Sequence, residues 1–197
     1  MKLRSLLVAL AVLVTSAAAH AQGAAYLTPT VARISESAAD NGTYSFLGTG
    51  VTSRFFYGVT LGGFYDIPAQ YTGFKKVEIG VDLRDAIVKA NDATQNTFAL
   101  GGRVAFAPIT ARFHPYLEPF VAAGTTRSPH TAIHVTKLQY GIFGGADYDL
   151  NRHISFRAIE VGFSGLTTAS DATIGASATV PTTHQISLSS GFTFRLP

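Results

Sequence analysis

One small group of residues has the chemical types that acyl transfer or hydrolysis needs. Ser164 or Ser170 could act as a nucleophile, with His184 as its base and Asp171 as the group that orients the base. This chemistry requires the base to lie within hydrogen-bond reach of the hydroxyl, and the spacing of these residues does not specify that contact. We therefore predict no catalytic residue and keep the group as an alternative.

Two histidines raise the question of a metal site. His130 and His134 fall in one predicted loop, but Pro129 and the Thr-rich surroundings indicate irregular chain rather than a helix that would align them. Because a protein zinc site usually needs three or four ligands, we expect solvated histidines and no metal. Paired glycines such as Gly144-Gly145 lie in predicted strands with no helix after them, which excludes a phosphate-binding loop. No cofactor is expected.

Charged side chains alternate with apolar ones along residues 76–84. Lys76, Glu78, Asp82 and Arg84 share one parity, and Val77, Ile79, Val81 and Leu83 share the other. A period of two with this contrast predicts a β-strand that has one polar face and one apolar face. Ion pairing on the polar face is therefore the most prominent chemistry that the sequence offers.

The first residues predict export. Lys2 and Arg4 precede the apolar run Leu6 to Val14, and Ala19-His20-Ala21 has small residues where a signal peptidase would cleave. We expect residues 1–21 to be a cleaved signal peptide and residues 22–197 to form a single domain. Removing Lys2 and Arg4 from 15 basic residues leaves 13 against 12 acidic ones. This near balance argues against a nucleic-acid partner.

The composition favours a membrane barrel. Charged residues make up 14% of the chain, against roughly 25% in soluble domains, and cysteine is absent. No long apolar segment follows the signal peptide, and only helices or closed barrels satisfy the backbone in lipid. Strands of a membrane barrel are about ten alternating residues long. Eight such segments are predicted, at Tyr26–Ser37, Phe55–Asp66, Lys75–Asp85, Asn96–Ala107, Pro115–Thr125, Thr136–Tyr148, Arg152–Phe163 and Thr183–Leu196.

The predicted connections alternate in length. Those at Ile67–Phe74, Pro108–His114 and Asp149–Asn151 are short. Those at Ala38–Arg54, Ala86–Gln95, Thr126–Val135 and Ser164–Thr182 are mostly longer. Short turns at one rim and longer loops at the other are typical of an outer-membrane barrel.

The sizes of the side chains indicate which face is inside. The polar stripes are mostly Gly, Ser, Thr and Ala, which fit a narrow lumen, whereas the bulky apolar stripes would overfill it and must face lipid. A bulge near Ala158 would also turn Glu160 inward. Because charges in a narrow interior need partners, we expect an ion-pair network that plugs the lumen. Its predicted members are Lys76, Glu78, Asp82, Arg84, Arg103, Glu118, Lys137, Asp147, Arg157 and Arg195.

One segment supports a family resemblance. Gly144-Gly145-Ala146-Asp147-Tyr148-Asp149-Leu150 followed by His153-Ile154-Ser155-Phe156-Arg157 resembles the penultimate hairpin of small bacterial outer-membrane β-barrel proteins, the OmpA membrane domain, OmpX and OmpW types. The resemblance implies an all-β, eight-stranded antiparallel up-and-down transmembrane barrel in a Gram-negative outer membrane. Those proteins often end on an aromatic residue, whereas this chain ends Phe194-Arg195-Leu196-Pro197.

The leading hypothesis for function is a barrel without enzymatic activity that has a structural or surface-interaction role. Its expected partners are outer-membrane lipids, the barrel assembly machinery and an extracellular partner at the longer loops. Two alternatives stay open, namely a narrow, porin-like pore for small solutes and an outer-membrane enzyme that hydrolyses or transfers acyl groups of lipids.

Overall fold

The computed structural model describes residues 22–37, 45–67, 73, 76–106, 112–129, 134–166 and 183–196. The predicted signal peptide, residues 1–21, lies outside these ranges. The described part of the chain contains no helix long and apolar enough to cross a membrane.

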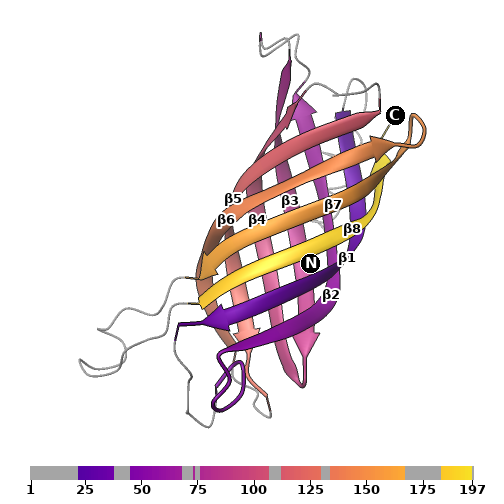
Figure 1. Ribbon diagram of the computed structural model, residues 1–197. Helices are drawn as coiled ribbons and strands as arrows, with labels where there is room; N and C mark the ends of the chain where they lie inside the picture. Colours follow the sequence, from indigo (N-terminus) through magenta and orange to yellow (C-terminus); the bar gives the residue numbers. More distant parts are fainter. Residues whose placement is uncertain are drawn as a thin grey trace, which may run out of the picture.

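Eight antiparallel strands close into a single barrel, in which each strand pairs with its sequence neighbours and β8 pairs with β1. The strands are β1 (Gln22–Glu36), β2 (Ser53–Ile67), β3 (Val77–Ala90), β4 (Ala93–Phe106), β5 (Phe113–Arg127), β6 (His134–Asp149), β7 (Ile154–Leu166) and β8 (Thr183–Arg195). They wind obliquely around the barrel (Figure 1). The all-β, eight-stranded up-and-down fold predicted from the alternating pattern is confirmed.

The two ends of the barrel are distinguished by what lies there. The loop end is where β1 finishes, β2 starts and the β3–β4 turn lies. The turn end is where Gln22 and Leu196 lie, together with the β6–β7 turn at residues 150–153. β1 begins at Gln22, four residues before the predicted start at Tyr26.

The apolar stripes face outward, as predicted. Leu61, Leu100 and Leu188 are 59%, 54% and 50% exposed, although they are among the most apolar residues of the chain. Large apolar side chains are rarely exposed as a continuous surface in water-soluble proteins, whereas a membrane barrel requires such a belt. The lumen faces hold small residues together with charged ones and, in addition, bulky rings such as Tyr26 and Phe56.

Strand β7 contains a bulge next to Ala158, which is the condition under which the sequence placed Glu160 inside the barrel. The pairing of β7 with β8 shifts register between Arg157 and Glu160, and both of these side chains are buried in the lumen. Without the extra residue, the alternation of faces would have turned Glu160 toward lipid. The bulge therefore lets two charged residues that are three positions apart share the interior.

The predicted connection Ala86–Gln95 is wrong. β3 continues to Ala90 and β4 starts at Ala93, so that only Asn91 and Asp92 separate them. Both have positive φ angles, 41° and 67°, which suit a two-residue turn of the primed type. Asn and Asp tolerate this left-handed conformation better than other non-glycine residues. The longer strands place Asp85 well inside the barrel wall rather than at its rim.

Candidate functional site

The centre of the lumen holds a group of buried ion pairs around Arg84. Its guanidinium Nε lies 3.0 Å from Asp82, Nη1 lies 2.9 Å from Glu160, and Nη2 lies 2.6 Å from Glu118. The side chains of Arg84, Asp82, Glu118 and Glu160 are at most 3% exposed. One guanidinium thus joins strands β3, β5 and β7 across the interior.

Two more arginines extend this group toward the turn end. Arg157 donates from Nε to Asp147 at 3.0 Å and from Nη1 to Glu160 at 3.0 Å. Arg103 donates to the other oxygen of Asp147 at 3.0 Å, and its Nε lies 3.5 Å from Asp66. Because Glu160 and Asp147 each contact two arginines, the ion pairs form one continuous chain. We call Arg84, Arg103, Arg157, Asp66, Asp82, Glu118, Asp147 and Glu160 the ionic cluster.

Aromatic rings fill the space around these charges. The Arg103 guanidinium lies 4.0 Å from the centre of the Phe64 ring and 3.8 Å from that of Tyr116. The Arg157 guanidinium lies 4.2 Å from the centre of the Tyr26 ring. The two tyrosine hydroxyls donate to the carboxylates, Tyr26 to Asp82 at 2.8 Å and Tyr116 to Glu160 at 2.6 Å. The planar guanidinium is suited to both stacking and ion pairing, which lysine is not.

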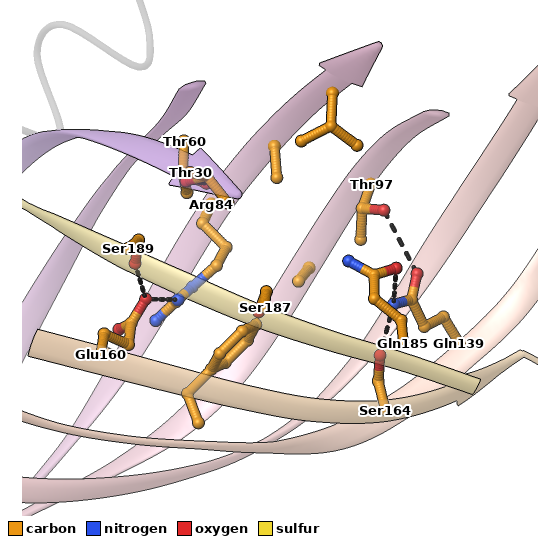
Figure 2. A pocket seen from close by; sticks show the side chains of 14 residues that line it. Thr30, Thr60, Arg84, Thr97, Gln139, Glu160, Ser164, Gln185, Ser187 and Ser189 are labelled. Carbon is orange, nitrogen blue, oxygen red and sulfur yellow. Dashed lines mark hydrogen bonds and ion pairs between the residues drawn. The ribbon is translucent and has the colours of Figure 1, made fainter. Parts of the chain in front are cut away.

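An uncharged polar layer lies next to the ionic cluster on the side of the loop end. Gln139 on β6 donates to Ser164 at 2.7 Å and accepts from Thr97 at 3.2 Å, while Gln95 donates to Gln185 at 2.9 Å. We call Gln95, Thr97, Gln139, Ser164 and Gln185 the glutamine layer. Figure 2 shows Arg84 and Glu160 on one side of a small cavity and four members of the glutamine layer, Thr97, Gln139, Ser164 and Gln185, on the other. The cavity has a volume of about 30 Å³.

Apolar side chains lie beside the glutamine layer, on the β1 to β4 side of the lumen, where Ile34 pairs with Gln185 and Val88 pairs with Gln95. Leu47, in the described part of the β1–β2 connection, is 0% exposed and packs with Ile34, Phe56 and Val88 of the wall. Phe46 from the same segment stacks on the Phe56 ring with 5.2 Å between ring centres. A loop segment therefore enters the mouth of the barrel and buries apolar surface there.

A smaller polar group lies at the turn end. Asp149 at the end of β6 accepts from Ser155 at 2.8 Å and from Arg195 at 2.9 Å, and it lies 2.9 Å from His114. These side chains join β5, β6, β7 and β8 just below the ionic cluster.

The residues predicted for the lumen network separate into two groups. Asp82, Arg84, Arg103, Glu118, Asp147 and Arg157 come together in the ionic cluster, as does Glu160 through the bulge. Arg195 instead pairs with Asp149 at the turn end, and Glu78 is half-buried near the start of β3.

Two predicted members lie apart from the cluster. Lys76 is exposed in the turn before β3 and does not enter the lumen. Lys137 is half-buried near the loop end of β6, and no described residue forms an ion pair with it. Both residues sit near strand ends, where a long side chain reaches water without a buried partner.

The hydrolase group does not assemble from its described members. Ser164 is buried in the lumen, where it accepts from Gln139. His184 is exposed on the outer surface and stacks on Phe163, whose ring is 55% exposed. The wall of the barrel therefore separates this hydroxyl from this base. Ser170 and Asp171 lie outside the described residues.

The described residues also contain no group of three or more His, Cys, Asp or Glu side chains that could hold a metal ion. His130 lies outside the described residues, and His134 is the exposed first residue of β6.

Several residues of the interior were absent from the predicted network. Asp66, Tyr26, Tyr116 and Ser189 all bond to the ionic cluster. Asp66 could have been included, because it has the lumen parity of β2. Tyr116 could have been included in the same way, because it has the parity of Glu118 on β5. Tyr26 lies in the first predicted strand, where the alternation of polar and apolar residues is irregular.

Comparison with solved structures shows the same architecture elsewhere. Neisserial surface protein A has a TM-score of 0.59 and 13% sequence identity with this chain, over 88% of this chain and 97% of that one. The fold is that of a small outer-membrane β-barrel protein. Ail of Yersinia pestis matches over 88% and 99% of the two chains with a TM-score of 0.46 and 10% identity. OprG of Pseudomonas aeruginosa matches over 89% and 97%, with a TM-score of 0.44 and 14% identity. No protein-family model and no curated protein sequence matches the chain.

Proposed function

We propose that this chain is a closed outer-membrane barrel that stabilises the cell envelope and presents its loop end to a partner outside the cell. The observation that supports the proposal is the packing of side chains inside the barrel. The ionic cluster joins β3, β5 and β7 across the interior, and the glutamine layer joins β4, β6, β7 and β8. The apolar group around Leu47 packs beside the glutamine layer on β1 to β4.

The size of the remaining space supports closure. The cavity between Arg84 and the glutamine layer has a volume of about 30 Å³, which is room for very few water molecules. Opening a passage for solutes would require the Arg84 contacts with Glu118 and Glu160 to separate. Removing one partner from a buried ion pair costs about 3–5 kcal/mol. Because separation of the Arg84 contacts would likewise leave buried charges without partners, we expect spontaneous opening of the lumen to be rare.

The outer surface supports insertion in a lipid bilayer. Tyr65, Phe106 and Tyr148 are exposed near the turn end, where aromatic rings suit the boundary between hydrocarbon and water. Arg33 and Lys89 are exposed near the loop end, where basic groups can reach anionic head groups. We propose outer-membrane lipids as the surrounding partners and the barrel assembly machinery as the route of insertion.

Electrical recording tests closure directly. Purified mature protein inserted in planar bilayers should give no stepwise conductance. The triple variant Arg84→Ser, Glu118→Ser, Glu160→Ser removes the bulk and charge at the centre of the lumen but keeps Arg103, Arg157 and the glutamine layer. Stepwise conductance from this variant alone would show that the Arg84 contacts form the barrier. Regular conductance steps from the unmodified protein would instead establish the narrow pore and overturn closure.

A further inference from the structure

The outer face of β3 carries one residue that conflicts with its surroundings. Asp85 follows Arg84 and therefore points to the opposite side of the wall. Its outward neighbours on β3 are Leu83 and Ile87, and its register partners are Leu61 on β2 and Phe98 on β4. All four neighbours are exposed apolar side chains. Among the described strands, Asp85 is the one acidic residue at an outward-facing position.

Asp85 lies deep in the apolar belt rather than at its rim. It precedes Lys89, the last outward residue of β3, by four positions. With about 3.3 Å per residue and a tilt of about 45°, this spacing places Asp85 roughly 9 Å further into the membrane than Lys89. An ionisable side chain at such a depth is costly and usually serves a function.

No described residue satisfies this carboxyl group. One of its oxygens is covered by the protein and has no hydrogen-bond partner. Asn96, an outward residue of β4 that is paired with Ile87, is half-buried and likewise makes no side-chain hydrogen bond within the described chain. An acceptor and a donor thus lie on neighbouring strands of the lipid-facing surface, and neither has a partner.

The surface around Asp85 permits close approach of another protein. Gly63 on β2 and Gly102 on β4 are outward residues opposite Leu83 and Val81, and a side chain at Gly102 would meet no atom within 4 Å. A shallow hollow beside Gly102 is lined by Val81, Leu100 and Val121. Between transmembrane helices, small residues let two backbones approach closely and polar side chains bond across the contact, and we apply the same packing argument to this strand surface.

We propose that this face, centred on Asp85 and Asn96, binds a second copy of the same chain. The argument is complementarity. Two copies inserted in the same direction and related by a two-fold axis along the membrane normal meet at equal depth. The Asn96 amide of each copy then donates to the Asp85 carboxyl of the other, so that one contact satisfies four polar groups. The proposal rests on the membrane insertion proposed above.

Disulfide trapping tests the contact, because the natural chain has no cysteine. Leu83→Cys places a single thiol beside Asp85. Leu188→Cys on β8 is the matched control, because the two leucines are 47% and 50% exposed on well-separated strands. In outer membranes treated with a mild oxidant, Leu83→Cys should give a covalent dimer and Leu188→Cys should not. Adding Asp85→Val to Leu83→Cys should reduce the dimer roughly tenfold, as expected for the loss of two membrane hydrogen bonds. Asp85→Asn keeps an acceptor oxygen and should retain most of it.

Several results would overturn the second copy as the partner. These are equal cross-linking at both positions, no dimer with Leu83→Cys, a Leu83→Cys dimer that Asp85→Val leaves unchanged, and a cross-link from Leu83→Cys to a protein of different mass. Heat-modifiable migration on detergent gels, measured for every variant, reports barrel insertion separately. Inserted barrels without a dimer contradict only the self-contact, whereas absence from the membrane contradicts the proposed function as well.

Discussion

Arg84 and Asp85 are adjacent in the sequence and lie in opposite surroundings. Arg84 faces the lumen and contacts three carboxylates within 3.0 Å, whereas Asp85 faces outward among apolar side chains and has a buried oxygen without a hydrogen-bond partner. Both residues are charged side chains on the same strand. The difference shows that burying charge is tolerated in this barrel where neighbouring strands supply partners, and that the outer face departs from this rule at Asp85.

The contrast also separates residues that maintain the fold from those that point to an interaction. In the ionic cluster, Glu160 receives hydrogen bonds from Arg84, Arg157, Tyr116 and Ser189, so the local and global requirements agree. Natural proteins violate such local rules mainly at functional sites. An unpaired acid on the membrane face is therefore the clearest exception in the described structure.

The largest change in stability is expected from removing Arg84, the residue that forms ion pairs in the lumen. Arg84→Met keeps an unbranched apolar side chain but removes the guanidinium, which leaves Asp82, Glu118 and Glu160 without their shared cation. Because removing one partner of a buried ion pair leaves uncompensated charge, we expect the free energy of unfolding to fall by about 3–5 kcal/mol. Urea unfolding in lipid vesicles, followed by gel migration, measures it.

Arg33→Met is the matched control for this substitution. Arg33 is an exposed cation of the outer surface near the loop end, and its described bonds are limited to a 3.4 Å contact with Ser53 and a ring contact with Phe55. Its loss should change the free energy of unfolding by less than about 1 kcal/mol. Equal effects of the two substitutions would show that the Arg84 ion pairs do not stabilise the barrel.

Two adjacent glycines on β4 test the same contrast between the lumen and the outer face, with a smaller expected change in stability. A methyl group at Gly101 would collide with the Glu118 carboxylate, whereas one at Gly102 would meet open space. Gly101→Ala must push Glu118 away from Arg84, so we expect a loss of about 1–3 kcal/mol in the same urea titration. Gly102→Ala should be neutral or slightly stabilising, since alanine has less freedom to lose on folding. The reverse order would mean that the lumen at Glu118 has spare room.

The faces of the strands could be predicted from the sequence because alternation needs only local information. The sequence also indicated where a bulge would be needed, at Ala158, because without it Glu160 would lie on the apolar face of the strand. The sequence did not indicate which lumen residues form ion pairs with one another. Arg84 meets Glu118 and Glu160, which are 34 and 76 positions away, and the stagger between strands around the barrel decides which residues share a level.

The connection between β3 and β4 was predicted wrongly for a different reason. Asp85 interrupts the apolar stripe, so the pattern indicates that the strand ends there. Ala86, Ala90 and Ala93 then give too little contrast to show that the alternation continues. Asp85 is therefore both the residue that makes β3 look shorter in the sequence and the residue without a hydrogen-bond partner on the lipid-facing surface. A break in the sequence pattern therefore coincides with the site proposed for the self-contact.

The smallest change in stability is expected from replacing Asp85, and this change should be a gain rather than a loss. Asp85→Val restores the apolar surface, and an acid facing lipid costs less than the roughly 2–4 kcal/mol measured for Arg or Lys at the midplane. In dilute detergent micelles, where mass action separates the copies, we expect the free energy of unfolding to rise by about 1–2 kcal/mol. A loss of stability would show that Asp85 has a partner within its own chain. A gain, combined with a weaker Leu83→Cys cross-link, would show that the carboxyl group lowers the stability of the monomer and serves the contact between copies.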